Sequence, residues 1–236
     1  MNYTIITDQD ALLSFIEWLP DLEVHESFYL CLFARSKYVK GIAVLPHIKT
    51  DKAQLKRFTS NKERLFDKIR QLECPLGSYK QKDLIVPQEA LALYITINPR
   101  DFIKANTASV RKLLDLALQP YNGFHPYQEV MSEIQKAKSR SEFVTFDFDV
   151  DKEQISAEQL KSKINFINTE ALNVVETRGG YHVIIRPNAV WDTCKKDWYN
   201  KMRLILALYS DDHDNAGDIM LPVPGTSQGM FTPKFI

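Results

Sequence analysis

The spacing of apolar residues over the first 140 residues predicts a mixture of short helices and strands. Apolar positions recur at helical intervals, and an aspartate at the start of the first such stretch can cap a helix. Runs rich in β-branched and aromatic residues, ended by proline, glycine or charged residues, predict strands. The predicted helices span 8–18, 51–72 (as one or two helices), 109–118 and 127–137, and the predicted strands span 28–33, 42–45 and 91–97. The first two of these strands are expected to form a hairpin.

The pattern over residues 143–223 predicts the element order β-α-β-β-α-β. The strands span 143–148, 173–176, 182–185 and 219–223, and the helices span 156–167 and 193–208. This order is the split βαβ, or ferredoxin-like, arrangement. The predicted fold class is therefore α+β with two modules, an α/β module over 1–140 and a ferredoxin-like module over 141–236, which the short polar segment 136–141 divides.

The ferredoxin-like arrangement brings separate polar residues together. Its first strand is central, and its third and fourth strands run antiparallel on the two sides, so the end of the first strand lies beside their starts. Asp147 and Asp149 end the predicted first strand, His182 starts the third and Asp218 starts the fourth. We therefore expect these four side chains to meet at one edge of one sheet.

Composition and charge narrow the class of protein. Hydrophobic residues make up 44% of the chain and aromatic residues 11%, which is typical of a compact globular fold. The 30 basic and 30 acidic residues give a net charge of zero, which argues against a protein that coats duplex DNA but leaves room for a local cationic groove. No basic leader or long apolar run is present, so we expect a soluble cytoplasmic protein without a membrane segment.

The cysteines point to a reducing compartment. Cys31, Cys74 and Cys194 are widely separated, and no C-x-x-C pair occurs. This spacing argues against zinc ribbons and disulfide frameworks.

The run from Phe143 to Asp151 carries the first candidate chemistry. Asp147 and Asp149 are two residues apart, so they share one face of a strand while Phe146 and Phe148 share the other. Adjacent carboxylates repel each other unless cations neutralise them, and oxygen ligands suit Mg²⁺ or Mn²⁺. The alternative is a strand that simply runs into an acidic loop.

The segment from Thr177 to His182 joins two predicted strands. Its two glycines are typical of a hairpin turn, but glycines also let backbone N–H groups approach phosphate oxygens. Arg178 could bind a phosphate through two hydrogen bonds, and His182 could donate to a triphosphate oxygen. Beside a carboxylate pair we favour the phosphate-binding interpretation, because metal and phosphate sites occur together in phosphoryl transfer.

The remaining polar segments and histidines give further candidates. Asp218 is the better third carboxylate, whereas the acidic run 211–214 fits a solvated loop. The segment 224–228 could be structural, and Arg100 is either a surface arginine or a ligand-binding residue. We assign no role to His25, His47, His125 or His213, which lack ligand spacing.

The order of these motifs resembles that of the archaeo-eukaryotic primase superfamily, of the primase-polymerase type. That pattern is a D-x-D or D-x-E strand, a small-x-x-G-x-His turn and a third carboxylate, matched by Asp147-Phe-Asp149, Thr177–His182 and Asp218. Asn98-Pro-Arg100 is similar to an upstream N-P-R of phage and plasmid members, and Pro224-Gly-Thr226 to a later P-G-T. The resemblance covers roughly residues 90–230, but Leu221-Pro-Val223 stands where many relatives carry an arginine.

The resemblance implies a fold, an activity and a set of partners. An N-terminal α/β module would pack on an RRM-like module with the active site between them. The chain would be a DNA primase or polymerase that extends a 3′-hydroxyl on a single-stranded DNA template with NTP or dNTP and releases pyrophosphate. Two Mg²⁺ or Mn²⁺ ions would be held by Asp147, Asp149 and Asp218. The nucleotide would be bound by Thr177, Arg178, Gly179, Gly180 and His182, with Arg100 as a possible template or phosphate contact. Because the chain has no Walker A motif, any helicase would be a separate chain.

Two other functions remain open. Asp147-Phe-Asp149-Val150 also fits the D-x-D-x-[TV] strand of haloacid-dehalogenase-type phosphatases, although that motif usually lies near the start of its domain and is followed by Gly-Thr-Leu. The other is a catalytically silent protein that binds single-stranded DNA through its sheet.

Overall fold

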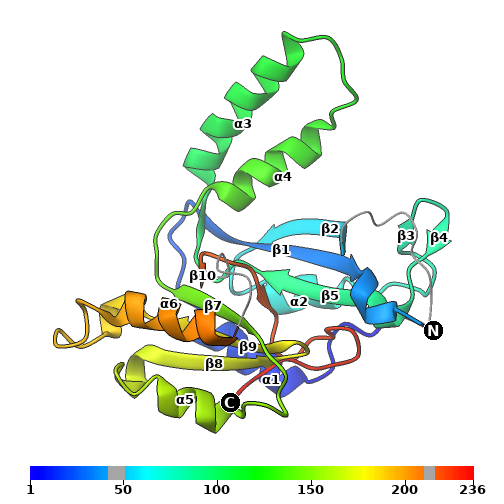
Figure 1. Cartoon of the computed structure of the whole chain (residues 1–236). Helices are drawn as coiled ribbons and strands as arrows, with labels where there is room; N and C mark the ends of the chain where they lie inside the picture. Colours follow the sequence, from blue (N-terminus) through cyan, green and yellow to red (C-terminus); the bar gives the residue numbers. More distant parts are fainter. Residues whose placement is uncertain (42–50, 210–215) are drawn as a thin grey trace.

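The computed structural model describes residues 1–41, 51–209 and 216–236 as a mixed α+β fold with antiparallel sheets (Figure 1). In this part of the chain, six α-helices accompany two five-stranded sheets. None of the described helices is long and apolar enough to cross a membrane. The predicted strand 42–45 lies outside the described residues.

The first sheet has the order β11-β5-β1-β2, and β6 pairs with the start of β1. Its strands are β1 (Glu26–Arg35), β2 (Lys52–Ser60), β5 (Leu91–Ile95), β6 (Arg100–Asp101) and β11 (Leu221–Pro222). β1 is buried along its whole length because both faces of the sheet are covered. Phe28, Leu30 and Leu32 pack in a core with α1 (Gln9–Trp18) and α2 (Leu65–Arg70), whereas Tyr29 and Cys31 face the opposite cluster.

The second sheet has the order β10-β7-β9-β8-β12. Its strands are β7 (Val144–Asp149), β8 (Leu172–Thr177), β9 (Gly180–Ile185), β10 (Ala216–Gly217) and β12 (Lys234–Phe235). β7 lies between β9 and β10 and is antiparallel to both. Phe146 and Phe148 pack beneath α5 (Ala157–Lys163) and α6 (Trp198–Tyr209), so the alternating carboxylates Asp147 and Asp149 face the other way.

The inner face of the second sheet changes from apolar to polar side chains along β7 and β9. At one end Phe143 and Ile184 join the core of the first sheet, as does Val175 on β8, which lies opposite His182. At the other end Asp147 and His182 lie directly opposite each other on β7 and β9. The two sheets are therefore packed together at the apolar end and separate at the polar end, where the candidate site lies.

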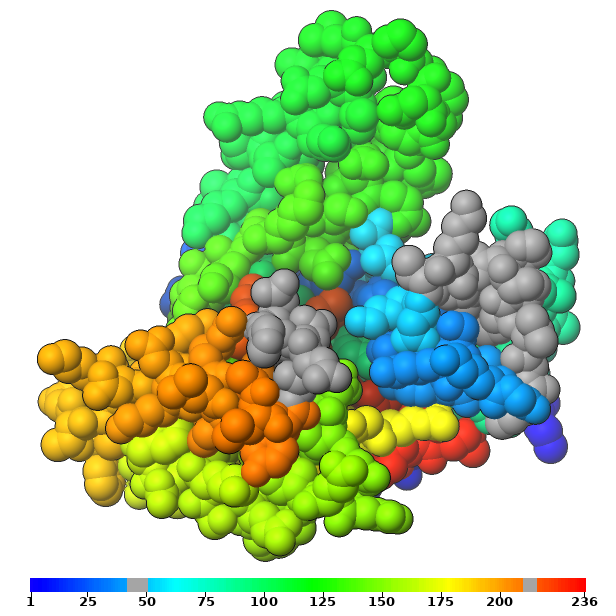
Figure 2. Space-filling model, in the orientation of Figure 1, coloured from blue at the N-terminus to red at the C-terminus, as the bar shows by residue number. Residues whose placement is uncertain are grey.

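Two helices extend away from the sheets as a hairpin, α3 (Phe102–Ala117) and α4 (Pro126–Lys136) (Figures 1 and 2). The hairpin is anchored at its base, where Ala105, Met131 and Ile134 pack against the first sheet. α3 begins earlier than the predicted residue 109, because the Asp101 carboxylate caps it by accepting from the Lys104 N–H.

Small elements complete the chain: strands β3 (Lys80–Gln81) and β4 (Leu84–Ile85), and the 3₁₀ turns η1 (Ser36–Val39), η2 (Gln88–Ala90), η3 (Thr169–Ala171) and η4 (Pro187–Ala189).

The prediction of helix from residue 51 was wrong for residues 52–60, which form β2; only α2 is helical there. β2 pairs with nearly all of β1, but the register shifts between Leu32 and Phe33, where Leu55 is an additional residue on β2. Such a bulge breaks the alternation of a strand. Ala53, Leu55 and Phe58 therefore reach the same core at irregular spacing. The sequence lacks the two-residue alternation that would predict a strand here.

The prediction of one strand over 219–223 was also wrong. β10 pairs with β7 in the second sheet, whereas β11 pairs with β5 at the edge of the first. An edge position suits Pro222, which has no N–H to donate. The chain thus passes between the sheets over residues 218–220, and Asp218 follows β10 instead of starting a strand.

The segment 224–228 is built into the fold. Gly225 has φ +79°, and its carbonyl accepts from the N–H groups of Thr7 and Asp8 at 2.9 and 3.0 Å. A Cβ at Gly225 would lie 2.4 Å from the Asp8 carbonyl oxygen. This close approach to the start of α1 gives the P-G-T segment a structural role.

Candidate functional site

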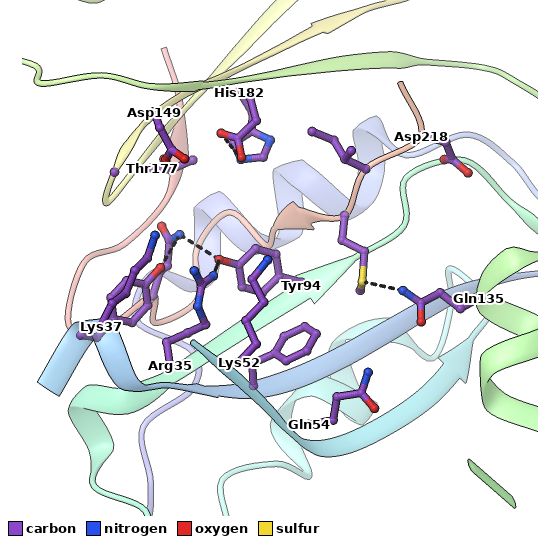
Figure 3. Close-up of a pocket in the computed structure, with 17 residues that line it drawn as sticks. Arg35, Lys37, Lys52, Gln54, Tyr94, Gln135, Asp149, Thr177, His182 and Asp218 are labelled. Carbon is purple, nitrogen blue, oxygen red and sulfur yellow. Dashed lines mark hydrogen bonds and ion pairs between the residues drawn. The ribbon is translucent and has the colours of Figure 1, made fainter. Parts of the chain in front are cut away.

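A pocket of about 680 Å³ lies between the polar ends of the two sheets (Figure 3). Six of the residues predicted from sequence line it: Asp147, Asp149, Thr177, Gly179, His182 and Asp218. Residues that sequence reasoning missed form the opposite wall, chiefly Arg35, Lys37, Lys52, Tyr38, Tyr94 and Gln228. The pocket therefore has an acidic wall from the second sheet and a basic wall from the first.

The acidic wall is held by the β7–β9 ladder. Asp147 pairs with His182 and Asp149 with Gly180, and the Asp147 carboxylate lies 3.1 Å from His182 Nε2. Partial desolvation, and then the negative charge of Asp147, raise the pKa of Asp149, although Lys37, His182 and Arg35 oppose this shift. The ionised pair is thus electrostatically unfavourable as it stands, and a bound cation would relieve it.

The turn between β8 and β9 needs glycine for a packing reason. Gly180 has φ +148°, and a Cβ there would lie 1.9 Å from the Phe148 carbonyl oxygen on β7. A Cβ at Gly179 would lie 3.2 Å from an Asp149 carboxylate oxygen, so this residue keeps the space beside the carboxylate open. Thr177 and Gly179 line the pocket, whereas Gly180 serves strand pairing.

Arg178 projects from this turn toward another part of the fold. Its backbone N–H donates to Gln228 Oε1 at 2.8 Å, and its guanidinium donates to the Gly229 carbonyl. The guanidinium also lies over the Tyr38 ring, 4.5 Å from the centroid. Arg178 is not part of the pocket lining formed by the described residues.

Asp218 is engaged by the Asn98-Pro-Arg100 segment. Arg100 Nη1 donates to one carboxylate oxygen at 2.7 Å, and Asn98 Nδ2 donates to the other at 2.9 Å. The Asn98 side chain also donates to the Phe143 carbonyl and accepts from the Phe143 N–H. These two bonds connect the end of β5 to the start of β7. Arg100 is only 2% exposed, so the surface-arginine interpretation was wrong; its charge is directed at Asp218.

The three predicted carboxylates line one pocket without forming one cluster. Figure 3 shows Asp218 well apart from Asp149 and His182. Within residues 1–41, 51–209 and 216–236, no group of three His, Cys, Asp or Glu side chains is close enough to hold a metal ion. Asp147 and Asp149 together offer the oxygen donors that suit Mg²⁺ or Mn²⁺, whereas Asp218 is already balanced by Arg100. The acidic run 211–214 lies outside the described residues.

The basic wall is organised by Asp51. Arg35 Nε and Nη2 lie 2.6 and 2.5 Å from Asp51 Oδ2, while Oδ1 accepts from the Lys37 N–H at 2.7 Å. Burial alone would raise the pKa of Asp51, but the Lys37 N–H and the Arg35 guanidinium lower it overall. Arg35 Nη1 also donates to Tyr94 Oη at 2.7 Å, so one arginine joins the ends of β1, β2 and β5.

The sequence contained only a weak signal for this wall. The stretch Arg35-Ser-Lys-Tyr-Val-Lys-Gly41 is basic, but it also fits an ordinary solvated connector. Lys52 opens β2, the strand that sequence reasoning missed, and lies opposite Arg35 in the register. The pairing of β1 with β2 is what brings the residues of the basic wall together.

Comparisons with family models, curated proteins and solved structures gave no match to this chain. The resemblance to the primase-polymerase motifs therefore stays a prediction from the residues themselves.

Proposed function

We propose that the chain is a template-dependent nucleotidyltransferase of the primase-polymerase type, which extends a 3′-hydroxyl with NTP or dNTP. The observation that carries this proposal is the pair Asp147 and Asp149, which faces a pocket with His182 beside it and the glycine turn at its rim. The strand order β10-β7-β9-β8 supports an RRM-like catalytic module, with the first sheet as the second module.

The residues fit the chemistry of nucleotidyl transfer. Asp147 and Asp149 would hold a divalent cation, which when bound would supply charge neutralisation for the triphosphate. The 3′-hydroxyl would attack the α-phosphate, and pyrophosphate would leave. His182 Nε2, held against Asp147, would orient that carboxylate, and the backbone at Gly179 would allow the nucleotide close to Asp149.

A second candidate is a silent protein that binds single-stranded DNA. It is favoured by one observation: both Asp218 oxygens are already hydrogen-bonded, to Arg100 and Asn98, so a third metal-binding carboxylate is not in place. This candidate predicts DNA binding that needs no metal and is indifferent to Asp147→Ala.

Nucleotide incorporation on single-stranded DNA tests the two candidates. The assay uses Mg²⁺ or Mn²⁺, NTPs and dNTPs separately, with and without a primer. We expect products from the wild type, none from Asp147→Ala/Asp149→Ala, and wild-type products from the control Asp151→Ala. Asp151 is exposed just beyond β7 and outside the pocket lining, so its substitution removes a carboxylate from the same stretch without touching the site. If no protein makes products while all bind DNA equally, the polymerase proposal fails.

A further inference from the structure

We propose that the first sheet supplies a polyphosphate-binding surface, in which Lys37 and Lys52 bind the triphosphate tail of the nucleotide and Arg178 does not. This proposal rests on the proposed function for the identity of the nucleotide. The ligand chemistry, a chain of linked phosphates, is argued from the basic wall alone.

The two lysines are positioned by a fixed framework. Lys52 lies directly opposite Arg35 in the β1–β2 register, and Lys37 follows two residues later in η1. Asp51 accepts hydrogen bonds from the Arg35 guanidinium and from the Lys37 N–H, so one carboxylate sets the positions of Arg35 and Lys37. The lysine side chains are exposed on the pocket side, where they can reach a ligand.

The cations of this wall are crowded together. Like charges directly opposite each other on neighbouring strands are unfavourable, and Arg35 and Lys52 are such a pair. Desolvation, followed by the positive charges of Arg35 and Lys37, lowers the pKa of Lys52, while Asp147 across the pocket opposes the shift. An anion that carries several charges would relieve this repulsion, as a polyphosphate does.

The two walls face each other across open space. Asp149, Lys37 and Arg35 all line this pocket, yet among the described residues neither cation forms an ion pair with Asp149 (Figure 3). The volume of about 680 Å³ between the walls is within the range of about 300–1,000 Å³ common for small-molecule sites. A fitting ligand presents positive charge to the carboxylates and negative charge to the lysines. A divalent cation bound to a polyphosphate has both properties.

Arg178 is committed elsewhere. Its guanidinium donates to the Gly229 carbonyl and covers the Tyr38 ring, while its N–H is bonded to Gln228. These contacts link the turn to the segment that follows β11. The phosphate-binding cations are therefore those of the first sheet.

Calorimetric titration with inorganic tripolyphosphate tests the surface without requiring turnover. In EDTA we expect Lys37→Ala and Lys52→Ala each to weaken binding about 10-fold, the value for one lost charge-assisted contact. The controls Lys40→Ala and Lys56→Ala, exposed and outside this pocket, should bind like the wild type. Asp147→Ala/Asp149→Ala should bind at least as tightly as the wild type in EDTA, because two repelling charges are gone, and should lose the gain that Mg²⁺ gives the wild type.

Wild-type tripolyphosphate affinity in both lysine variants would overturn the proposal. So would weaker binding of a single-stranded oligothymidylate with unchanged tripolyphosphate affinity, since the wall would then contact the DNA backbone. If incorporation depends on Asp147 and Asp149 but the KM for nucleotide is unchanged in the lysine variants, the surface is wrong and the proposed function stands. If the tripolyphosphate pattern holds and no nucleotide is incorporated, the surface stands and the polymerase is wrong.

Discussion

The two walls of the pocket differ in how they are supported. The acidic wall lies on β7 and β9, which pair over six residues each and cover a core with Phe146 and Val183. The basic wall lies where β1, η1 and β2 end, and it depends on the ion pair between Arg35 and Asp51. The first wall is set by backbone pairing and the second by side chains, so mutation should disturb the second more easily.

The carboxylates of the pocket differ in the charge that lies beside them. Asp218 balances a buried arginine, whereas Asp149 faces the open pocket beside another carboxylate. A carboxylate that compensates a buried charge stabilises the fold, while one held near a like charge is kept at a cost in stability and is typical of a binding site.

The largest expected effect is on stability and separates these two roles. Asp218→Asn should lower the free energy of unfolding by about 3 kcal/mol, because Arg100 would be left buried without a carboxylate. Asp149→Asn should leave stability unchanged or slightly higher at pH 7, because its raised pKa shows that the fold disfavours the ionised form. Urea unfolding of both variants measures the difference. Equal losses would mean that Asp218 and Asp149 play similar roles.

A smaller effect is expected at the basic wall, and it should depend on pH. Asp51→Asn keeps the shape of the side chain but removes the charge that pairs with Arg35, which should cost about 1 kcal/mol at pH 7. The pKa of Asp51 is lowered in the fold, so its stabilisation is present above the unfolded pKa of about 3.9 and is lost as pH falls through the folded value.

Unfolding of the wild type and Asp51→Asn between pH 7 and pH 3 tests this expectation. The difference between them should shrink as the pH falls. Asp21→Asn is the control, since Asp21 is 98% exposed in its pair with Lys62 and should show little effect at any pH. A difference that is constant with pH would show that hydrogen-bond geometry, not charge, supports the wall.

The acidic wall could be predicted from the sequence because its information is local. Alternation over Phe146–Asp149 fixes which side chains share a face, and the strand order then places His182 opposite Asp147. Glycine at 180 is required by the same close strand pairing. Each of these inferences needs only a few neighbouring residues and one topology.

The basic wall and the contact to Asp218 could not be predicted, because they depend on pairings between distant segments. A bulge at Leu55 hid β2, and with it the placement of Lys52 opposite Arg35. Arg100 meets Asp218 across 118 positions in the chain only because residues 218–220 pass from one sheet to the other. Exposed lysines are usually solvated, so nothing in the local pattern distinguishes Lys37 from its neighbours.

The smallest expected effect concerns Arg178, the arginine that the sequence favoured for phosphate binding and that the proposed polyphosphate surface leaves out. Arg178→Ala should lower stability by about 0.5–1 kcal/mol, the value for an exposed cation over an aromatic ring, because the guanidinium covers Tyr38. Tripolyphosphate binding should change less than in Lys37→Ala, since Arg178 is bonded to Gln228 and lies over Tyr38, outside the pocket lining formed by the described residues. Tyr38→Leu removes the ring but keeps Arg178, and should lower stability further, because it also removes the buried hydroxyl that accepts from Gln228 Nε2. If Arg178→Ala instead weakens tripolyphosphate binding as strongly as Lys37→Ala while stability is unchanged, the arginine binds phosphate, and the proposal that only the first sheet does so is wrong.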